Sequence, residues 1–345
     1  MASISDLLDP QPQLARDFDI VLVLSGGNAL GAFEAGVYEA LHDGGLHPNW
    51  IIGASIGAIN GALIAGAAPD RRVNVLRAFW RPDEARVAGT AGTWLLEAAD
   101  VGRRTAAASW TMMAGRPGIF GPMLSTMLPF TGQQHSLFET DQLERTLDRM
   151  VDFSRLNSGD CRFTATAVDL ETGEDVFYDT ADRAIEARHI RASAALPVTF
   201  PPVEIDGRWL VDGGLSANLP LDPLLADPPS RPVLCIAVDL LPLSGTLPAT
   251  LGEAASRMQD LVFAAQSRRT IARWRESYGS RDDVSITLLR IAYTDQSNEV
   301  AGKAMDFSRL TIRQRWKSGQ AAVGSVIEAA VAQAANGVPG LCIIG

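Results

Sequence analysis

The sequence has few cysteines, with Cys161, Cys235 and Cys342 as the only three among 345 residues. Their odd number and wide spacing fit neither a disulfide framework nor a C-x-x-C metal pair. This excludes a small disulfide-stapled scaffold and favours a reducing compartment, so we expect a cytoplasmic location. The sequence implies no metal ion and no organic cofactor.

Long hydrophobic runs are also absent. The longest apolar stretches, such as residues 58–68, fall short of the ~20 residues that a helix needs to span a bilayer. Residues 1–18 form a polar leader that lacks the apolar core of a signal peptide. We therefore expect a soluble protein, and a peripheral contact with a membrane surface stays open.

Positive charge is in deficit, because 30 lysines and arginines face 40 aspartates and glutamates, which gives a formal net charge of −10. Nucleic-acid binders gain affinity from clustered basic residues that neutralise phosphates, so we expect no nucleic-acid partner. The hydrophobic content of 47% is that of a globular chain. The length allows either two domains or one large α/β domain with an appendage.

Two strand-helix units follow the leader. Residues 20–24 form a continuous apolar run, typical of a strand buried on both faces of a parallel sheet. From Gly31 on, apolar residues recur at the spacing of a helix. Residues 50–52 and 58–67 repeat this pattern around a small-residue turn. The alternation predicts an α/β fold. Further strands are expected at residues 163–169, 176–178, 233–238 and 284–291, and residues 203–205 and 208–211 are expected to pair as a hairpin through Asp206-Gly207.

The turn between the second strand and its helix reads Gly53-Ala54-Ser55-Ile56-Gly57. A G-x-S-x-G turn lifts the serine hydroxyl clear of the sheet, and Gly53 and Gly57 let the backbone bend tightly. The helix that follows points its N-terminal amides at the serine. The motif predicts a nucleophilic Ser55, with a closely packed turn of no catalytic role as the alternative.

A glycine-rich loop, residues 25–31, follows the first strand. Free amides at a helix start suit either a dinucleotide phosphate or an oxyanion. The dinucleotide pattern needs glycine at position 28, where this chain has Asn28, and no acidic residue ends the second strand. The loop therefore favours an oxyanion hole formed by Gly26, Gly27 and Asn28, since asparagine tolerates a positive φ.

Asp212 ends the strand expected at residues 208–211, and two glycines after it leave its carboxylate approachable. An ordinary Asp-Gly-Gly turn is the alternative. A Ser-acid-His triad in the order of the α/β-hydrolases would need a histidine after Asp212, and none of the four histidines lies there. His189 falls on an expected helix, where we interpret it as a surface or capping residue.

The three motifs, in this order and context, resemble the patatin-like phospholipase family. The resemblance runs over about residues 19–239 and includes the stretch 192–202 before the aspartate strand. It implies a patatin-like three-layer α/β fold with a mainly parallel central sheet and helices on both faces. The catalytic domain would cover residues 19–240, and residues 241–345 would form a mainly helical C-terminal extension.

The resemblance also implies a chemistry. Ser55 would be the nucleophile and Asp212 the base of a Ser-Asp dyad, with the oxyanion hole around Gly26, Gly27 and Asn28. The expected reaction is hydrolysis of carboxylic esters of lipids through an acyl-enzyme. The family's loop carries an arginine or lysine where this chain has Leu30, so ester hydrolysis is a firmer expectation than a preference for phospholipid. A smaller acyl, thioester or hydroxyacyl substrate and a non-catalytic lipid-binding scaffold are the alternatives.

Two regions stay open. Residues 87–130 are rich in large apolar side chains and would form either an acyl-chain pocket wall or cover over the sheet. The basic residues after residue 250, among them Arg313, Arg315 and Lys317, would form either a solvated face of a packing layer or a contact with a phosphate-rich membrane surface. The oligomeric state and the role of the extension do not follow from the sequence.

Overall fold

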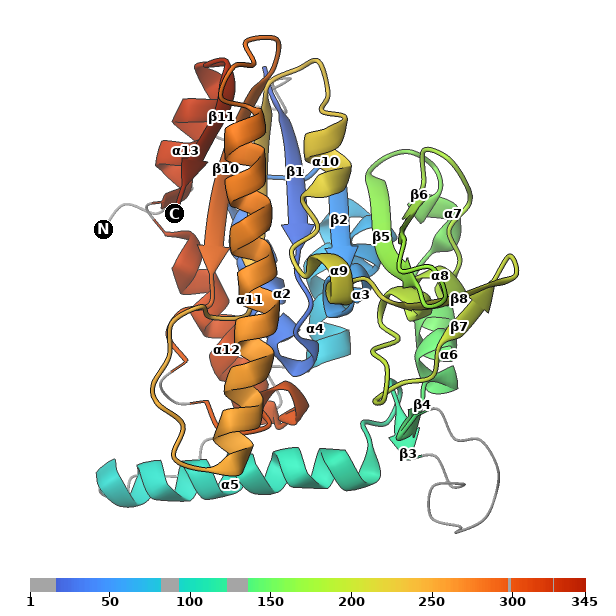
Figure 1. Cartoon of the computed structure of the whole chain (residues 1–345), viewed down its shortest axis with the longest axis vertical. Helices are drawn as coiled ribbons and strands as arrows, with labels where there is room; N and C mark the ends of the chain where they lie inside the picture. Colours follow the sequence, from blue (N-terminus) through green and yellow to red (C-terminus); the bar gives the residue numbers. More distant parts are fainter. Residues whose placement is uncertain (1–16, 82–92, 123–135, 297–298, 325) are drawn as a thin grey trace.

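The computed structural model describes residues 17–81, 93–122, 136–296, 299–324 and 326–345. Helices cover both faces of a central sheet, which gives a three-layer α/β protein (Figure 1). The strands of the described residues are β1 (Asp19–Leu24), β2 (Trp50–Ala54), β3 (Gly121–Pro122), β4 (Phe138–Glu139), β5 (Arg162–Asp169), β6 (Asp175–Asp179), β7 (Val203–Ile205), β8 (Arg208–Asp212), β9 (Val233–Asp239), β10 (Ser285–Ala292) and β11 (Gly340–Ile344).

The central sheet is mainly parallel. Its nine strands run in the order β11-β10-β9-β1-β2-β5-β8-β7, with β6 also paired to β5. The pairs from β11 to β5 are parallel, whereas β6 and β8 both run antiparallel to β5. The expected α/β fold with a mainly parallel sheet is confirmed, and so is the predicted hairpin of β7 with β8.

The helices divide between the two faces (Figure 1). On one face lie α2 (Ala32–Asp43), α3 (Ile56–Ala65), α4 (Arg72–Trp80), α12 (Arg309–Val323) and α13 (Val326–Ala335). On the other lie α9 (Gly214–Ala217), α10 (Asp222–Ala226) and α11 (Leu251–Ser277). The helices α6 (Asp141–Met150), α7 (Phe153–Leu156) and α8 (Ala187–Ser193) lie at the end of the sheet that contains β5, β6, β7 and β8. The helix α5 (Thr93–Ala114) crosses beyond the carboxyl ends of the parallel strands.

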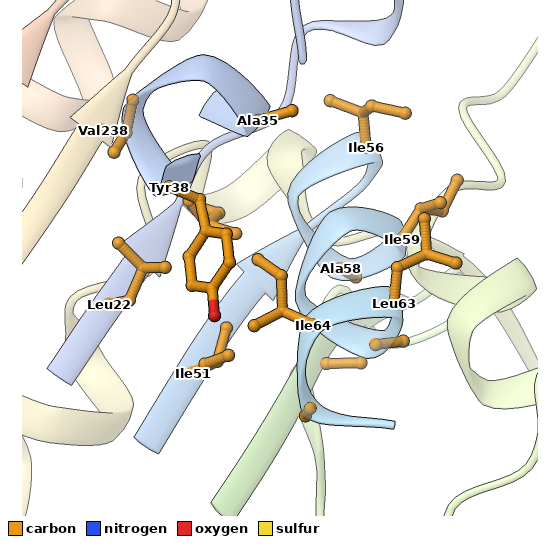
Figure 2. Close-up of a cluster of buried hydrophobic side chains, with 14 of the residues drawn as sticks. Leu22, Ala35, Tyr38, Ile51, Ile56, Ala58, Ile59, Leu63, Ile64 and Val238 are labelled. Carbon is orange, nitrogen blue, oxygen red and sulfur yellow. The ribbon is translucent and has the colours of Figure 1, made fainter. Parts of the chain in front are cut away.

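Side chains alternate between two apolar layers. Along β1, Leu22 and Leu24 join the cluster beneath α2 and α3, whereas Val21 and Val23 join the cluster beneath α10 and α11. Figure 2 shows the first cluster, with Tyr38 of α2 lying close to Leu22 and Ile51. A strand that is buried on both faces needs a continuous apolar run, which explains the pattern in the sequence.

The chain after residue 240 belongs to the same three layers. It is mainly helical, as expected, but β10 and β11 also extend the sheet beside β9. The sequence predicts β10 but not β11. The helix α12 crosses α2 in close backbone contact, since a Cβ on Gly36 or on Gly319 would come within 2.0 Å of a carbonyl oxygen of the other helix. Residues after 240 therefore contribute two strands to the central sheet as well as helices.

Two expectations concern membranes and the leader. In the residues that the structure describes, no helix is both long and apolar enough to cross a bilayer. Most of the polar leader, residues 1–16, lies outside the described residues, as do residues 87–92 and 123–130 of the apolar segment.

Candidate active site

The register of the sheet brings Ser55 and Asp212 together. Ala54, at the end of β2, pairs with Thr166 of β5, and the next residue of β5, Ala167, pairs with Asp212 of β8. The carboxyl ends of β2 and β8 therefore lie level with each other on the two sides of β5. Ser55 and Asp212 therefore lie side by side at one cavity.

Ser55 lies on a sharp turn between β2 and α3 with φ 57° and ψ −123°. This backbone conformation costs a non-glycine residue on the order of 1–3 kcal/mol, so the surrounding contacts must hold it in place. The Ser55 amide donates to both the carbonyl and the hydroxyl oxygen of Ser193, each at 3.1 Å. The strained turn is held by the segment that leads to Asp212.

At Gly53 and at Gly57, neighbouring backbone comes too close to leave room for a side chain. A Cβ on Gly53 would lie 2.4 Å from the carbonyl carbon of Gly57, and a Cβ on Gly57 would lie 2.3 Å from the carbonyl oxygen of Leu24. Neither glycine has a positive φ. The turn therefore needs these glycines for space between two backbones and not for an unusual dihedral angle.

The Asp212 carboxylate is 3% exposed and accepts the Gly214 amide at 2.8 Å. Burial raises the pKa of Asp212 from 3.8 to about 6, and the hydrogen bonds from Ser55 and Gly214 limit the rise. Burial disfavours the charged form, so this carboxylate is a stronger base than an exposed aspartate while still ionised near neutral pH. A Cβ on Gly213 would lie 2.4 Å from the carbonyl oxygen of Thr166, which explains the glycine after the aspartate.

The glycine-rich loop presents two amides to the site and not three. The Gly26 amide donates to the carbonyl of Asn218 at 3.1 Å, so it is not available to an oxyanion and the expectation for Gly26 is wrong. The amides of Gly27 and Asn28 have no protein acceptor among the described residues. Asn28 has a φ of 52°, as the sequence allows, and its side chain donates to the sulfur of Met305 at 3.5 Å.

A cavity of about 220 Å³ adjoins Ser55 and Asp212. Its walls come from the loop, from α3, α5 and α11, and from residues 302–305. The lining residues are mostly apolar: Gly26, Gly27, Asn28, Ser55, Ile56, Ile59, Met112, Ile119, Thr140, Leu143, Ala194, Leu196, Thr199, Phe200, Asp212, Asn218, Leu241, Gln259, Phe263, Gly302, Ala304 and Met305.

The apolar segment of residues 87–130 was expected to form either an acyl-chain pocket wall or cover over the sheet, and its described residues do both. Met112 and Ile119 line the cavity. Phe120 is fully buried and packs against Phe138 and Phe200, with ring centroids 5.0 and 5.1 Å apart. Among the described residues of the segment, some therefore form pocket wall and others form core.

His189 takes no part in this site. It caps α8, because its Nδ1 accepts the amide of Glu186 at 2.9 Å, which confirms the capping interpretation. A surface position is wrong, since His189 is fully buried and its ring lies 4.5 Å from that of Tyr178. Burial lowers the pKa of His189 to about 4, so the ring is neutral. His189 does not line the cavity.

Sequence reasoning missed the contribution of the C-terminal region. Phe263, Gly302, Ala304 and Met305 line the cavity although they lie far beyond the three motifs. No local pattern marks them, because their position depends on how residues 299–306 fold back onto the loop. In the described residues, no group of three or more His, Cys, Asp or Glu side chains could hold a metal ion.

The fold and the site together define a three-layer α/β protein with a serine on a strained strand-helix turn beside a buried aspartate. A family model described as patatin-like phospholipase matches residues 22–225, and a second, described as patatin phospholipase, matches residues 250–336. The chain belongs to the patatin-like phospholipase family.

Individual relatives are distant. An uncharacterized NTE family protein of Mycobacterium tuberculosis is 27% identical over 205 residues, which cover 59% of this chain and 45% of that protein. The patatin-like phospholipase domain-containing protein 7 of Rattus norvegicus is 27% identical over 208 residues, 59% of this chain and 12% of that protein. The chain thus spans less than half the length of either relative.

Among solved structures, VipD from Legionella pneumophila is similar with a TM-score of 0.37 and 13% identity, covering 88% of this chain and 69% of that one. A likeness of this degree says nothing about function.

Proposed function

We propose that the protein is a serine acyl hydrolase that cleaves carboxylic esters of lipids. The observation that carries the proposal is the position of Ser55, on its strained turn, next to the buried carboxylate of Asp212 at an apolar cavity. Membership of the patatin-like phospholipase family supports the same reaction class.

In the proposed mechanism, the Ser55 hydroxyl attacks the ester carbonyl carbon while Asp212 takes the hydroxyl proton. The amides of Gly27 and Asn28 would hold the oxyanion of the tetrahedral intermediate. Asp212 then returns the proton to the leaving alkoxide, which departs and leaves an acyl group on Ser55. A water molecule, deprotonated by Asp212, then attacks the acyl carbonyl carbon. Asp212 returns this proton to the Ser55 oxygen as the bond to Ser55 breaks and the carboxylic acid leaves.

Two effects supply the rate in this mechanism. A positioned general base contributes typically 10²–10⁴-fold, and its efficiency is greatest when its pKa lies near the working pH. The pKa of Asp212, about 6, lies closer to neutrality than that of an exposed aspartate. Each oxyanion donor contributes about 10²–10³-fold in a water-excluded site.

The cavity limits the substrate. Its volume of about 220 Å³ is below the roughly 300–1,000 Å³ of pockets that bury a whole drug-sized ligand. The cavity therefore accepts the reacting end of an acyl chain, and a longer chain must extend outside it. This size favours, as a second candidate, an esterase or thioesterase acting on a smaller acyl or hydroxyacyl substrate.

A peripheral contact with a lipid surface is part of the proposal. Trp110 and Met113 of α5 and Met258 of α11 are each 65% or more exposed, on the two helices that also line the cavity. Exposed apolar side chains gathered near a cavity commonly mark an apolar ligand or interface. We place the protein in the cytoplasm, where thiols such as those of the buried Cys161 and Cys235 stay reduced.

The proposal is tested by the hydrolysis of p-nitrophenyl butyrate and of a phosphatidylcholine. We expect wild-type protein to hydrolyse the butyrate ester and Ser55→Ala to lose the activity. Ser216→Ala serves as the matched control and should keep the activity, since it removes an exposed hydroxyl that lies close to Asp212 in the sequence but does not line the cavity. Hydrolysis that survives in Ser55→Ala, or a folded wild-type protein inactive on both esters, would contradict the proposal.

A further inference from the structure

We propose that the C-terminal region completes the substrate site, and that Arg315 is a positioning residue that fixes the cavity wall of residues 299–306 to the glycine-rich loop. The inference rests on the proposed hydrolase function and deepens it. It names the part of the chain that sets acyl-chain preference and the group that holds this part in place.

The wall belongs to a segment outside the residues 22–225 that the first family model matches. Gly302, Ala304 and Met305, in and beside the short helix η5 (Lys303–Met305), all line the cavity. Met305 also meets the loop directly, since its sulfur accepts the Asn28 side-chain amide at 3.5 Å. The wall therefore touches a residue whose backbone amide is a proposed oxyanion donor.

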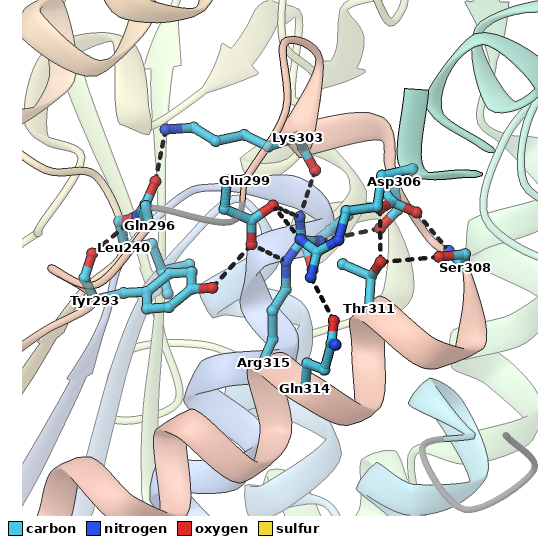
Figure 3. A network of polar contacts seen from close by, with 12 residues as sticks. Leu240, Tyr293, Gln296, Glu299, Lys303, Asp306, Ser308, Thr311, Gln314 and Arg315 are labelled. Carbon is cyan, nitrogen blue, oxygen red and sulfur yellow. Dashed lines mark hydrogen bonds and ion pairs between the residues drawn. The ribbon is translucent and has the colours of Figure 1, made fainter. Parts of the chain in front are cut away.

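Arg315 of α12 joins this wall to the loop, and Figure 3 shows it among Glu299, Lys303 and Asp306. Its Nη1 donates to the carbonyl oxygens of Ala29 and Asp306, both at 3.0 Å, and its Nη2 donates to the carbonyl of Lys303 at 2.9 Å. Ala29 follows Asn28 in the loop, while Lys303 and Asp306 stand on either side of Ala304 and Met305, which line the cavity. One guanidinium thus fixes both segments at once.

The remaining two Arg315 donors hold Glu299. The Nε and Nη2 groups donate to the two Glu299 oxygens at 2.8 and 2.7 Å, so all five N–H donors of the guanidinium have acceptors. The Arg315 side chain is 1% exposed and that of Glu299 is 4% exposed. An arginine this buried is almost never found without a charge partner.

Glu299 is itself held by a network. It accepts the Tyr293 hydroxyl at 2.8 Å and pairs with Arg104 of α5 at 3.3 Å. Burial alone would raise the pKa of Glu299, but the two arginines outweigh it and hold the pKa below its usual value. Lys303 forms a second ion pair, with Asp260 of α11 at 2.7 Å, which links the wall to that helix. The wall is thus anchored to α5, α11 and α12 together.

This arrangement is specific to arginine. A lysine at position 315 would keep the charge, but it offers three donors from one point and cannot bind Glu299 with two parallel hydrogen bonds while also holding three carbonyls. The wall and the loop would then shift relative to Ser55. A misplacement of about 1 Å caused by a change away from the reacting atoms can lower a rate by about 10²-fold.

The test compares kcat and KM for p-nitrophenyl butyrate and p-nitrophenyl octanoate in Arg315→Lys, Arg315→Met, Met305→Ala and Lys317→Met. Lys317 is exposed on the same helix, so Lys317→Met removes the same charge from α12 without touching the network. Circular dichroism and the thermal transition report whether each variant is folded. Arg315→Lys decides the question if Arg315→Met does not fold.

We expect folded Arg315→Lys to lower kcat on both esters by about 10- to 100-fold and to lower kcat/KM further for octanoate than for butyrate. Met305→Ala should change the octanoate-to-butyrate ratio by about tenfold, since it removes one large apolar side chain from the wall. Lys317→Met should match the wild type.

Two results would overturn the inference alone: active, folded Arg315 variants with wild-type rates and ratio, or losses that scale with the folded fraction and are equal for both esters. An inactive wild-type protein would instead overturn the proposed function, and the inference with it.

Discussion

Burial of the Asp212 charge should destabilise the folded protein at neutral pH, and Asp212→Asn should relieve this cost. Burial raises the pKa of Asp212 from 3.8 to about 6. The folded protein then binds this proton more tightly than the unfolded chain, so the contribution of Asp212 to the free energy of unfolding falls as the pH rises through that interval. At 1.36 kcal/mol per pKa unit, the cost reaches about 3 kcal/mol above pH 6.

Asparagine is a suitable replacement, because it keeps an oxygen that can accept the Gly214 amide but carries no charge. Asp212→Asn should therefore be more stable than the wild type by about 3 kcal/mol at about pH 8, and by almost nothing near pH 4, where both side chains are neutral. Urea unfolding followed by tryptophan fluorescence at about pH 4, 6 and 8 gives both free energies.

Asp227→Asn is the matched control, since it removes the same charge from an exposed position. Asp227→Asn should not reproduce the gain in stability expected of Asp212→Asn at about pH 8. A difference between Asp212→Asn and the wild type that is the same at every pH, or an Asp212→Asn protein that is less stable at pH 8, would refute the reasoning from a buried charge.

Three further results are expected. The rate on a neutral ester should fall about tenfold for each pH unit below about 6, because Asp212 must be ionised to act as a base, and a rate that stays level down to pH 4 would contradict this. His189→Ala should keep its kcat but lose about 1–3 kcal/mol of stability in urea unfolding, since it removes a buried side chain and the acceptor of the Glu186 amide; a large loss of kcat in the folded variant would restore a histidine mechanism. Gly53→Ala should abolish ester hydrolysis or folding because its Cβ has no space, whereas Gly102→Ala, at an open position on α5, should do neither.

The strand-helix units at the start of the chain could be predicted because their signals are local. Residues 20–24 and 50–52 are apolar runs that end in small-residue turns, and such runs require burial on both faces of a sheet. The extension of the sheet by β11 could not be predicted in this way. Residues 340–344 form a short run after a helix, and only their pairing with β10 makes them a sheet strand.

The charged residues of the C-terminal region show a second limit. Arg315 looks in sequence like its neighbours Arg313 and Lys317, and a solvated face or a phosphate contact was expected for all three. The structure instead buries Arg315 against Glu299, which lies 2.7 Å away. Burial of a charge depends on a partner brought by another segment, and helical periodicity does not reveal that partner.

The motifs located the candidate site but not all of its hydrogen bonds. Ser55 and Asp212 were predicted to act together, and the register of β2, β5 and β8 brings their side chains into contact. The use of the Gly26 amide by Asn218 could not be predicted, because Asn218 has no marked pattern and reaches the loop only through the fold.

The most direct test of the account is the reaction of the folded protein with a fluorophosphonate, followed by mass spectrometry of the peptides. An activated serine attacks the phosphorus and keeps the phosphonyl group, so the adduct marks the nucleophile. The account predicts one adduct, on Ser55, and a much slower reaction in Asp212→Asn. An adduct on Ser25 or Ser193 with Ser55 unmodified, or an equal rate in Asp212→Asn, would contradict the assignment of Ser55 and Asp212 as a catalytic pair.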